Sequence, residues 1–254
     1  MKKSKISYRF ILILLGVLIV PISACEDLLE KRPDTGGARI PTEQLVENRE
    51  DLQELLNSAY DVLGNTYNGD LQNLINCLND NLVRPVQQDD LTSVWLRSTS
   101  IFNGSMSTVF NNLYFTVFRC NTVFEEVDNI ELSSLERNRF LGEASFLRAL
   151  AHFEAVRGWA QPYGYTPNNS HPGVAIQLEN SVENTERSTV QEVYSQILSD
   201  IIVAKELLPE TNPEGSPYAN KWAALALEAE IRFQMHQYDL AYQLANEVIE
   251  MGPY

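Results

Sequence analysis

The chain has few of the residues that build metal and nucleophile sites. It contains three histidines and three cysteines in 254 residues, and His152, His171 and His236 are too far apart for metal-ligand spacing. It also lacks a Cys-x-x-Cys pair, a Gly-x-Ser-x-Gly elbow, a phosphate-binding glycine loop and a calcium-loop pattern. We therefore expect no metal site, no cofactor and no enzymatic activity.

Positive charge is scarce as well. The chain carries 19 Lys and Arg against 34 Asp and Glu, a formal net charge of −15. Four of the cations (Lys2, Lys3, Lys5 and Arg9) precede residue 10, so the chain from residue 25 onward has 15 cations and a net charge near −19. A surface of this charge excludes nucleic acid as a partner and disfavours polyanionic ligands, whereas neutral sugars and peptides remain compatible with it.

No apolar run is long enough to span a membrane. The N-terminal run, Phe10–Ile22, has 13 residues, whereas a membrane-spanning helix needs about 20. It follows a basic start and leads into Ile22-Ser23-Ala24-Cys25, the order of a bacterial lipoprotein signal. We expect residues 1–24 to be a signal peptide, Cys25 to carry the lipid and residues 25–40 to form a flexible tether. A plain secreted protein and an N-terminal helix are the alternatives.

From residue 41 to residue 254, apolar residues recur at helical spacing and no stretch alternates convincingly as a strand. Stripes of this spacing lie at residues 52–63, 71–82, 109–127, 146–159, 193–204 and 238–248. Three signals mark helix starts: capping boxes at Ser133 with Glu136 and at Ser188 with Gln191, and an N-cap followed by proline at Ser216-Pro217. Helix ends are marked by Gly64, Pro85, Pro209 and Gly252-Pro253. The pattern predicts an all-α fold of seven helices.

The last two predicted helices have the spacing of a tetratricopeptide (TPR) pair. Small residues (Ala226, Ala229, Ala241 and Ala245) allow two helices to approach closely, Tyr238 lies at the turn and Pro253 ends the unit. His236 occupies the place where such repeats usually have a turn glycine. Because the earlier helices do not repeat at a fixed period, we predict irregular TPR-like hairpins, with an ordinary helical hairpin as the alternative.

Several segments resemble the SusD/RagB family of nutrient-binding lipoproteins. The acidic start after the lipidation cysteine, Cys25–Pro33, is similar to the mature start of these proteins, and Glu143–Phe153 with Arg157 is similar to their most recognisable helix. Further similar segments are Tyr114 with Cys120-Asn121, Ser188–Pro209 and Lys221–Ala241. The chain departs from the family at Ala160–Tyr165, where the usual glycine-then-proline order is absent. Fixed charges such as Glu143 and Arg148 are expected to form ion pairs between packed helices.

The resemblance implies a SusD-like α-helical fold for residues 41–254, an oligosaccharide ligand with peptide as the exception, and delivery of the ligand to a SusC-like TonB-dependent transporter. It also implies attachment to the outer membrane through Cys25, facing the cell exterior. Family members continue beyond the TPR pair into a loop-rich half that supplies much of the ligand surface. The chain therefore resembles the N-terminal portion of such a protein and is interpreted as truncated.

Candidate ligand-binding residues lie between two predicted helices, from Val83 to Gly104. Trp95 offers an aromatic face for the C–H side of a pyranose, and Asn103 offers an amide for its hydroxyl groups. Tyr163 and Tyr165 are weaker candidates. Trp95 also fits a role as a packing residue beneath its own loop. Cys77 and Cys120 are predicted to be buried free thiols, with a disulfide as the alternative.

The sequence thus predicts a surface-anchored helical lipoprotein that binds a nutrient and is not an enzyme. The alternative function is a helical scaffold that holds the transporter but has no ligand site of its own, because the C-terminal half is missing. The identity of the ligand is not determined by any of these residues.

Overall fold

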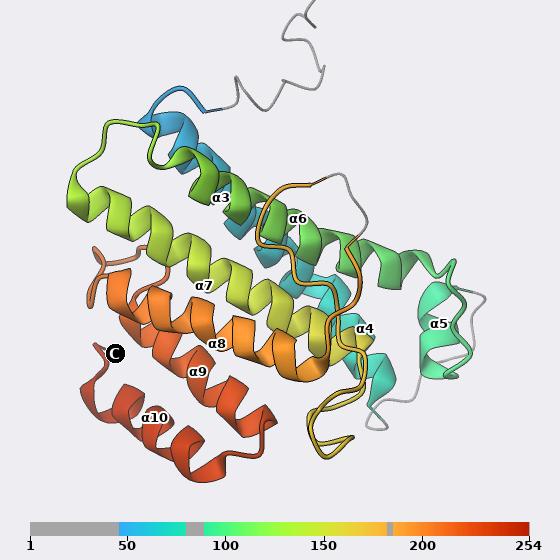
Figure 1. Ribbon diagram of the computed structural model, residues 1–254. Helices are drawn as coiled ribbons and strands as arrows, with labels where there is room; N and C mark the ends of the chain where they lie inside the picture. Colours follow the sequence, from blue (N-terminus) through green and yellow to red (C-terminus); the bar gives the residue numbers. More distant parts are fainter. Residues whose placement is uncertain (1–45, 80–88, 182–184, 254) are drawn as a thin grey trace, which may run out of the picture. The chain divides into compact units, whose positions relative to one another are not determined.

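The computed structural model describes residues 46–79, 89–181 and 185–253, and most of these residues are helical (Figure 1). The helices are α3 (Arg49–Asn65), the π-helical turn η2 (Thr66–Asp70), α4 (Leu71–Leu78), α5 (Asp90–Trp95), α6 (Gly104–Glu126), α7 (Ser134–Trp159), α8 (Val190–Leu207), α9 (Lys221–Gln234) and α10 (Tyr238–Met251). Within the described ranges, β-structure is limited to one isolated bridge between Pro172 and Thr189. The predicted all-α class is confirmed.

The predicted signal peptide, lipidated Cys25 and tether lie outside the described residues, which all belong to a unit of the chain that begins at Val46. Among the helices that are described, none is long and apolar enough to cross a membrane.

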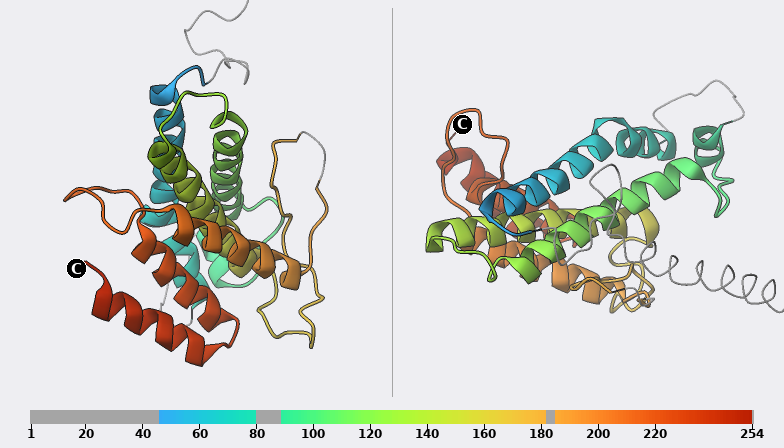
Figure 2. Two further views of the ribbon diagram at one scale, coloured as in Figure 1. Left: turned by 60° about the vertical axis from the view of Figure 1, so that its left-hand side comes forward. Right: turned by 90° about the horizontal axis from the view of Figure 1, so that it is seen from above.

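Helix α7 is central to the packing. It lies against α6 on one side and α8 on the other, and α3 packs on both α6 and α7 (Figures 1 and 2). Helices α8, α9 and α10 then follow one another as a stack, each contacting the next. Because α7 has neighbouring helices on several sides, its buried residues are distributed around the whole circumference of the helix. Among them, Phe140, Leu147 and Phe153 are at most 1% exposed.

The predicted apolar stripes form the core. Leu52 and Leu56 of α3, Leu113 of α6, and Ile197 and Ile201 of α8 are completely buried. Burying a leucine or isoleucine side chain stabilises a fold by about 1.5–3 kcal/mol, so these stripes carry much of the association between helices.

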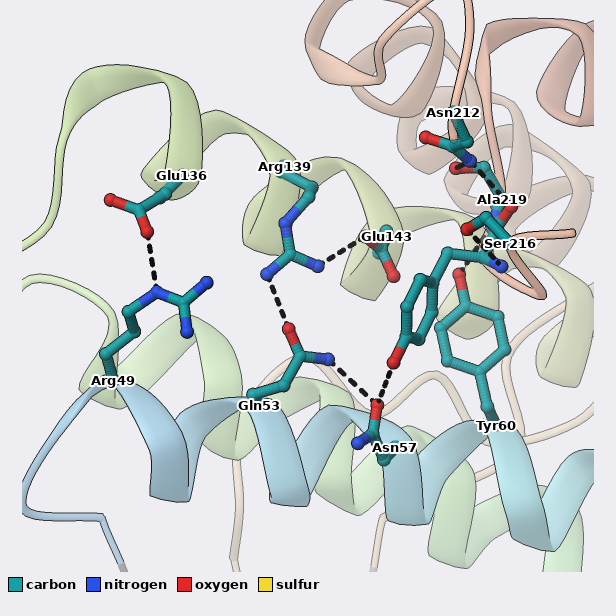
Figure 3. Close-up of polar contacts among 11 residues, drawn as sticks. Arg49, Gln53, Asn57, Tyr60, Glu136, Arg139, Glu143, Asn212, Ser216 and Ala219 are labelled. Carbon is teal, nitrogen blue, oxygen red and sulfur yellow. Dashed lines mark hydrogen bonds and ion pairs between the residues drawn. The ribbon is translucent and has the colours of Figure 1, made fainter. Parts of the chain in front are cut away.

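A polar network joins α3, α7 and the connection between α8 and α9 (Figure 3). On α7, Arg139 binds Glu143 at 2.8 Å and also donates to Gln53 Oε1 of α3 at 2.6 Å. From the connection, the hydroxyl of Tyr218 donates to Asn57 Oδ1 at 2.9 Å. Burial raises the pKa of Glu143, and its ion pair with Arg139 opposes that shift. The ion pair of Glu143 therefore lies within α7 and not between helices as predicted, and the contact with α3 is made by Arg139 through Gln53.

The capping box at Ser133 and Glu136 is confirmed, but the second one is displaced by one residue. Helix α8 begins after Thr189, whose hydroxyl accepts from the backbone N–H of Glu192, and the Glu192 carboxylate accepts from the N–H of Thr189 at 2.8 Å. Ser188 instead pairs through its backbone with Val174 and Gly173, at 3.0 and 2.7 Å. That pairing with a distant segment excludes Ser188 from the cap position, so the predicted Ser188–Gln191 box is wrong.

The predicted start of the sixth helix at Ser216-Pro217 is also wrong. Helix α9 begins four residues later, capped by Asn220, whose side chain accepts from the N–H of Ala223 at 2.9 Å. Ser216 lies in a turn, and Ala219 donates its N–H to the hydroxyl of Tyr60 at 2.9 Å. Residues 216–219 are bound to α3 and are not helical, so α9 begins later in the sequence than predicted.

Two further boundaries differ from the prediction. Helix α3 does not stop at Gly64 but runs to Asn65 and continues into η2, where Gly69 has a φ of 150° and bends the chain toward α4. The segment predicted as a loop between two helices contains the short helix α5, capped by Asp89, whose carboxylate accepts from the N–H of Thr92 at 2.7 Å.

Helices α9 and α10 form the predicted hairpin. Ala241 and Leu244 of α10 are buried against α9, and α10 ends at Gly252 as expected. His236, in the turn, has a φ of 62°, the left-handed conformation that glycine adopts without strain. The place where TPR-like repeats usually carry glycine is therefore a left-handed position in this chain.

Candidate functional site

Three aromatic side chains meet where the end of α7 passes the first half of α6. Phe110 and Tyr114 lie one turn apart on α6, with ring centroids 4.7 Å apart, and Trp159 is the last residue of α7. The Phe110 and Trp159 rings are 5.2 Å apart at an angle of 60°. All three are partly exposed. We call Phe110, Tyr114 and Trp159 the aromatic cluster.

The first of two hollows beside this cluster has a volume of about 490 Å³. Its lining comprises the aromatic cluster together with Val174, Ala175, Gln177, Thr185 and Arg187 of the connection between α7 and α8. That connection is held along α6 by side-chain bonds to its carbonyl groups, from Tyr114 Oη to Ala175 at 2.7 Å and from Asn121 Nδ2 to Gln177 at 3.3 Å. Burial raises the pKa of Tyr114 to about 12, so its hydroxyl stays protonated and donates.

The second hollow has a volume of about 450 Å³ and shares Phe110 and Trp159 with the first. Its remaining lining comes from the connection between α5 and α6 and from the first turns of α6: Thr99, Ser100, Ile101, Asn103, Met106, Ser107 and Asn111. Ile101 and Phe102, at the tip of that connection, are 88% and 85% exposed. The two hollows thus have two aromatic residues in common, and the rest of their lining is a mixture of polar and apolar side chains.

This arrangement suits an uncharged or weakly charged ligand with one apolar face. The C–H face of a pyranose packs on an aromatic ring, while its hydroxyl groups need donors and acceptors such as Gln177, Thr185, Ser107 and Asn111. The hollows are also within the range of volumes typical of small-molecule sites. Within the described residues, no group of three or more His, Cys, Asp or Glu is placed to hold a metal ion.

Asn103 borders the second hollow, but its side chain is bonded within the protein. It is 4% exposed, its Oδ1 accepts from the N–H of Met106 at 2.9 Å, and its Nδ2 donates to Ser93 Oγ at 2.8 Å and to the carbonyl of Asp90 at 2.9 Å. It therefore caps α6 and ties it to α5. A ligand contact by Asn103 stays a prediction, and both hydrogens of its Nδ2 are already donated within the protein.

Trp95 is the last residue of α5 and is partly buried, so it lies on a helix and not in a loop. It does not line either hollow beside the aromatic cluster. The structure therefore does not bring Trp95 and Asn103 into one site there, and the role of Trp95 in binding stays a prediction.

The two weaker candidates lie in the connection after α7. Tyr163 contacts the ring of Tyr194 edge-on at 5.0 Å and donates its hydroxyl to Gln191 Oε1 at 3.2 Å. Tyr165 is 63% exposed and contacts the ring of His171 at 5.3 Å. Neither lines the two hollows.

The aromatic cluster was not predicted from the sequence, although a signal for it exists. Phe110, Tyr114 and Phe118 are spaced by four residues on α6 and stand one position after the core residues Val109, Leu113 and Val117. A row of aromatic residues offset from the core stripe marks a second face of the helix, which must meet another surface or solvent. That Trp159 lies at this face follows from the packing of α7 on α6.

Both cysteines in the described part of the chain are free and buried, as predicted. Complete burial raises the pKa of the Cys120 thiol to about 12, which makes it a poor nucleophile. Cys120 therefore serves the core and takes no part in the site.

Comparison with known proteins supports the sequence resemblance. A family model described as "Starch-binding associating with outer membrane" matches residues 27–233. The SusD-like protein P38 of Formosa agariphila is 33% identical over 167 residues, which are 63% of this chain and 30% of that protein. The SusD-like protein P25 of the same organism is 24% identical over 93% of this chain and 45% of its own length. The chain thus spans less than half of these relatives.

Solved structures share the fold. A SusD superfamily protein from Bacteroides thetaiotaomicron has a TM-score of 0.74 and 26% identity, and the match covers 80% of this chain and 46% of that one. A structure described as a laminarin-binding SusD-like protein has a TM-score of 0.67 at 18% identity, with 81% of this chain and 44% of that one covered. The helical arrangement of this chain is therefore that of about half of such proteins.

Proposed function

Because the chain belongs to the SusD-like family, whose description is starch-binding and associating with the outer membrane, we propose that it binds an oligosaccharide at the aromatic cluster. The protein is anchored to the outer membrane through Cys25, faces the cell exterior and passes its ligand to a SusC-like TonB-dependent transporter. Peptide is the alternative ligand. The observation that carries the proposal is the pair of hollows that share Phe110 and Trp159.

The geometry of the cluster supports a sugar platform. Tyr114 is held by its bond to the Ala175 carbonyl, and Phe110 contacts both Tyr114 and Trp159, so the rings are fixed before a ligand arrives. A preformed aromatic surface loses little side-chain entropy on binding, which favours affinity. Neutral hydroxyl groups also suit a chain whose net charge from residue 25 onward is near −19.

The protein acts by binding and not by catalysis. Four deeply buried carboxylates each form an ion pair with an arginine or a lysine. They belong to Glu143, Glu154, Asp200 and Glu228. Carboxylates held in this way are bound to cations inside the fold, so these four do not supply a general acid and a nucleophile. The ligand is therefore released unchanged to the transporter.

Calorimetry tests the ligand site. The lipidated chain in detergent is titrated with a panel of neutral oligosaccharides, including linear glucans, and with short peptides. We expect Trp159→Ala to weaken oligosaccharide binding by about 1–3 kcal/mol, since the pyranose face loses its aromatic partner. Trp95→Ala is the matched control, because Trp95 is an aromatic residue outside both hollows. If Trp95→Ala abolished binding and Trp159→Ala did not, the site would lie at α5.

The anchor is tested separately. Cys25→Ser removes the thiol that takes the diacylglycerol, so we expect no incorporation of labelled fatty acid and accumulation of the uncleaved precursor. Equal labelling of the variant and the wild type would disprove lipidation at Cys25.

A scaffold for the transporter is the second candidate function. Helices α9 and α10 expose large apolar side chains, among them Phe233, Tyr242, Ile249 and Met251, which are 56% to 76% exposed. Large apolar side chains exposed along one helical hairpin are available for contact with another polypeptide. Absence of heat with the whole ligand panel, together with co-purification of an outer-membrane transporter, would favour the scaffold over the ligand-binding function.

A further inference from the structure

Arg187 is the charged residue in the lining of the first hollow. Its guanidinium donates from Nε to the carbonyl of Gly173 at 2.7 Å, and from Nη2 to the carbonyls of Trp159 at 3.0 Å and Pro172 at 3.4 Å. These bonds tie the end of α7 to the connection that follows it. They also hold the guanidinium in place beside the aromatic cluster.

The charge of Arg187 is not balanced by any described residue. Arg139, Arg148 and Arg157 each form an ion pair with a carboxylate, whereas Arg187 forms none in the described ranges. Its Nη1 group, with two N–H donors, likewise has no partner there. In the same part of the chain, no aspartate or glutamate lines the first hollow.

We propose that the first hollow takes an acidic sugar, a hexuronate residue within an otherwise neutral oligosaccharide, whose carboxylate binds Arg187 while its pyranose ring packs on the aromatic cluster. This inference rests on the proposed function and specifies its ligand class. A carboxylate accepts charge-assisted hydrogen bonds from a guanidinium, and these are stronger than bonds between neutral groups.

The charge of the whole chain limits the kind of acidic ligand. A net charge near −19 from residue 25 onward repels a polymer with a carboxylate on every residue. One uronate flanked by neutral sugars keeps the local bond to Arg187 and adds little long-range repulsion. Arg187 is thus a specificity-determining residue, and through its bond to the Trp159 carbonyl it is also a positioning residue for the platform.

The test uses two probes that differ only in the acidic group. They are glucuronosyl-xylotriose and its carboxyl-reduced counterpart, glucosyl-xylotriose, titrated by calorimetry into the lipidated chain in detergent. We expect the acidic probe to bind at least about tenfold more tightly than the neutral one, because a hydrogen bond to a charged group is worth that much in affinity. Arg187→Gln should remove this preference, and Arg187→Lys should keep part of it while weakening both probes.

Arg137→Gln is the control for net charge. It removes one positive charge, as Arg187→Gln does, but Arg137 lies near the beginning of α7, about 30 Å along the helix from Trp159, and binds Asp128. The ratio of the two affinities should be unchanged in this variant. An equal loss of preference in Arg137→Gln and Arg187→Gln would show a long-range effect and overturn the assignment to Arg187.

Two other outcomes separate this inference from the proposed function. Equal affinity of the wild type for both probes would overturn the acidic-sugar inference and leave carbohydrate binding standing. Failure of both probes and of every neutral oligosaccharide to bind would overturn both. Because the wild-type comparison needs no variant, the inference remains testable even if Arg187→Gln does not fold.

Discussion

Arg148 binds Asp200 through two parallel hydrogen bonds, from Nε to Oδ2 at 2.9 Å and from Nη2 to Oδ1 at 2.7 Å. The pair joins α7 to α8, and the side chains are only 11% and 4% exposed. Arg148 also donates to Asn121 Oδ1 of α6 at 3.0 Å and lies over the ring of Phe124, 4.3 Å from its centroid. One guanidinium thus contacts residues of three helices, two of which, α6 and α7, carry the aromatic cluster.

Removing one member of this pair should destabilise the protein strongly. Asp200→Ala leaves the Arg148 charge buried without a counter-ion, so we expect a loss of about 3–5 kcal/mol in the free energy of unfolding. Denaturant titration followed by circular dichroism measures it. The double variant Arg148→Met/Asp200→Leu should recover most of the loss, because it removes the stranded charge. A double variant less stable than Asp200→Ala would contradict this account.

Gly142 should not tolerate alanine. A Cβ at this position of α7 would come within 3.0 Å of the backbone nitrogen of Leu208, at the end of α8, which neither helix can avoid without moving. We expect Gly142→Ala to lower stability by about 1–3 kcal/mol. Gly158 is the matched control: it is also in α7, and a Cβ there would meet nothing within 4 Å, so Gly158→Ala should stabilise the helix by about 0.5–1 kcal/mol. Thermal melts of both variants test this prediction, and equal changes in melting temperature would refute it.

The left-handed conformation of His236 should lower the free energy of unfolding of the protein. With a φ of 62°, this position costs an L-residue about 1 kcal/mol that glycine does not incur. His236→Gly should therefore be more stable than His236→Ala by about that amount, because both variants lack the imidazole and differ only in the Cβ. The comparison is made by chemical denaturation. Equal stability of the two variants would show that the turn relaxes and does not impose this backbone conformation.

Buried His152 should make stability depend on pH. Burial lowers its pKa to about 3, helped by the nearby charge of Arg148, whereas the unfolded chain has the ordinary value near 6.5. Between these values the unfolded chain binds a proton that the folded chain does not, so the contribution is complete above pH 6.5 and is lost as the pH falls toward 3. Relative to His152→Gln, the wild type should lose about 2 kcal/mol between pH 7 and pH 5.

The difference between wild type and His152→Gln is what identifies the histidine. Glu143 and Glu154, whose pKa values are raised by burial, act in the opposite direction, since the folded chain then holds protons that the unfolded chain has released. Both groups are present in both proteins, so their effects cancel in the difference. Urea titrations at several pH values supply the data. Parallel stability curves for the two proteins would exclude His152 as the titrating group.

Local signals in the sequence were enough to place most helices. The Ser133–Glu136 capping box and the core stripe of α6 depend on residues within one or two turns, and both were predicted and confirmed. The start of α8 was predicted one residue early. Ser188 and Thr189 both carry a hydroxyl, and the choice between them depends on the pairing of Ser188 with Val174 and Gly173.

The amino-acid sequence alone determined the helical class, the family resemblance and the TPR-like hairpin, because these depend on residue spacing along one helix or between neighbouring helices. Only the tertiary structure decided which polar and aromatic faces meet. Phe110 and Trp159 lie on different helices, and their contact depends on how α7 packs on α6. Arg187 reaches the same hollow from a connection with no regular structure. Such long-range juxtapositions have no local signature, since packing of the whole core sets them.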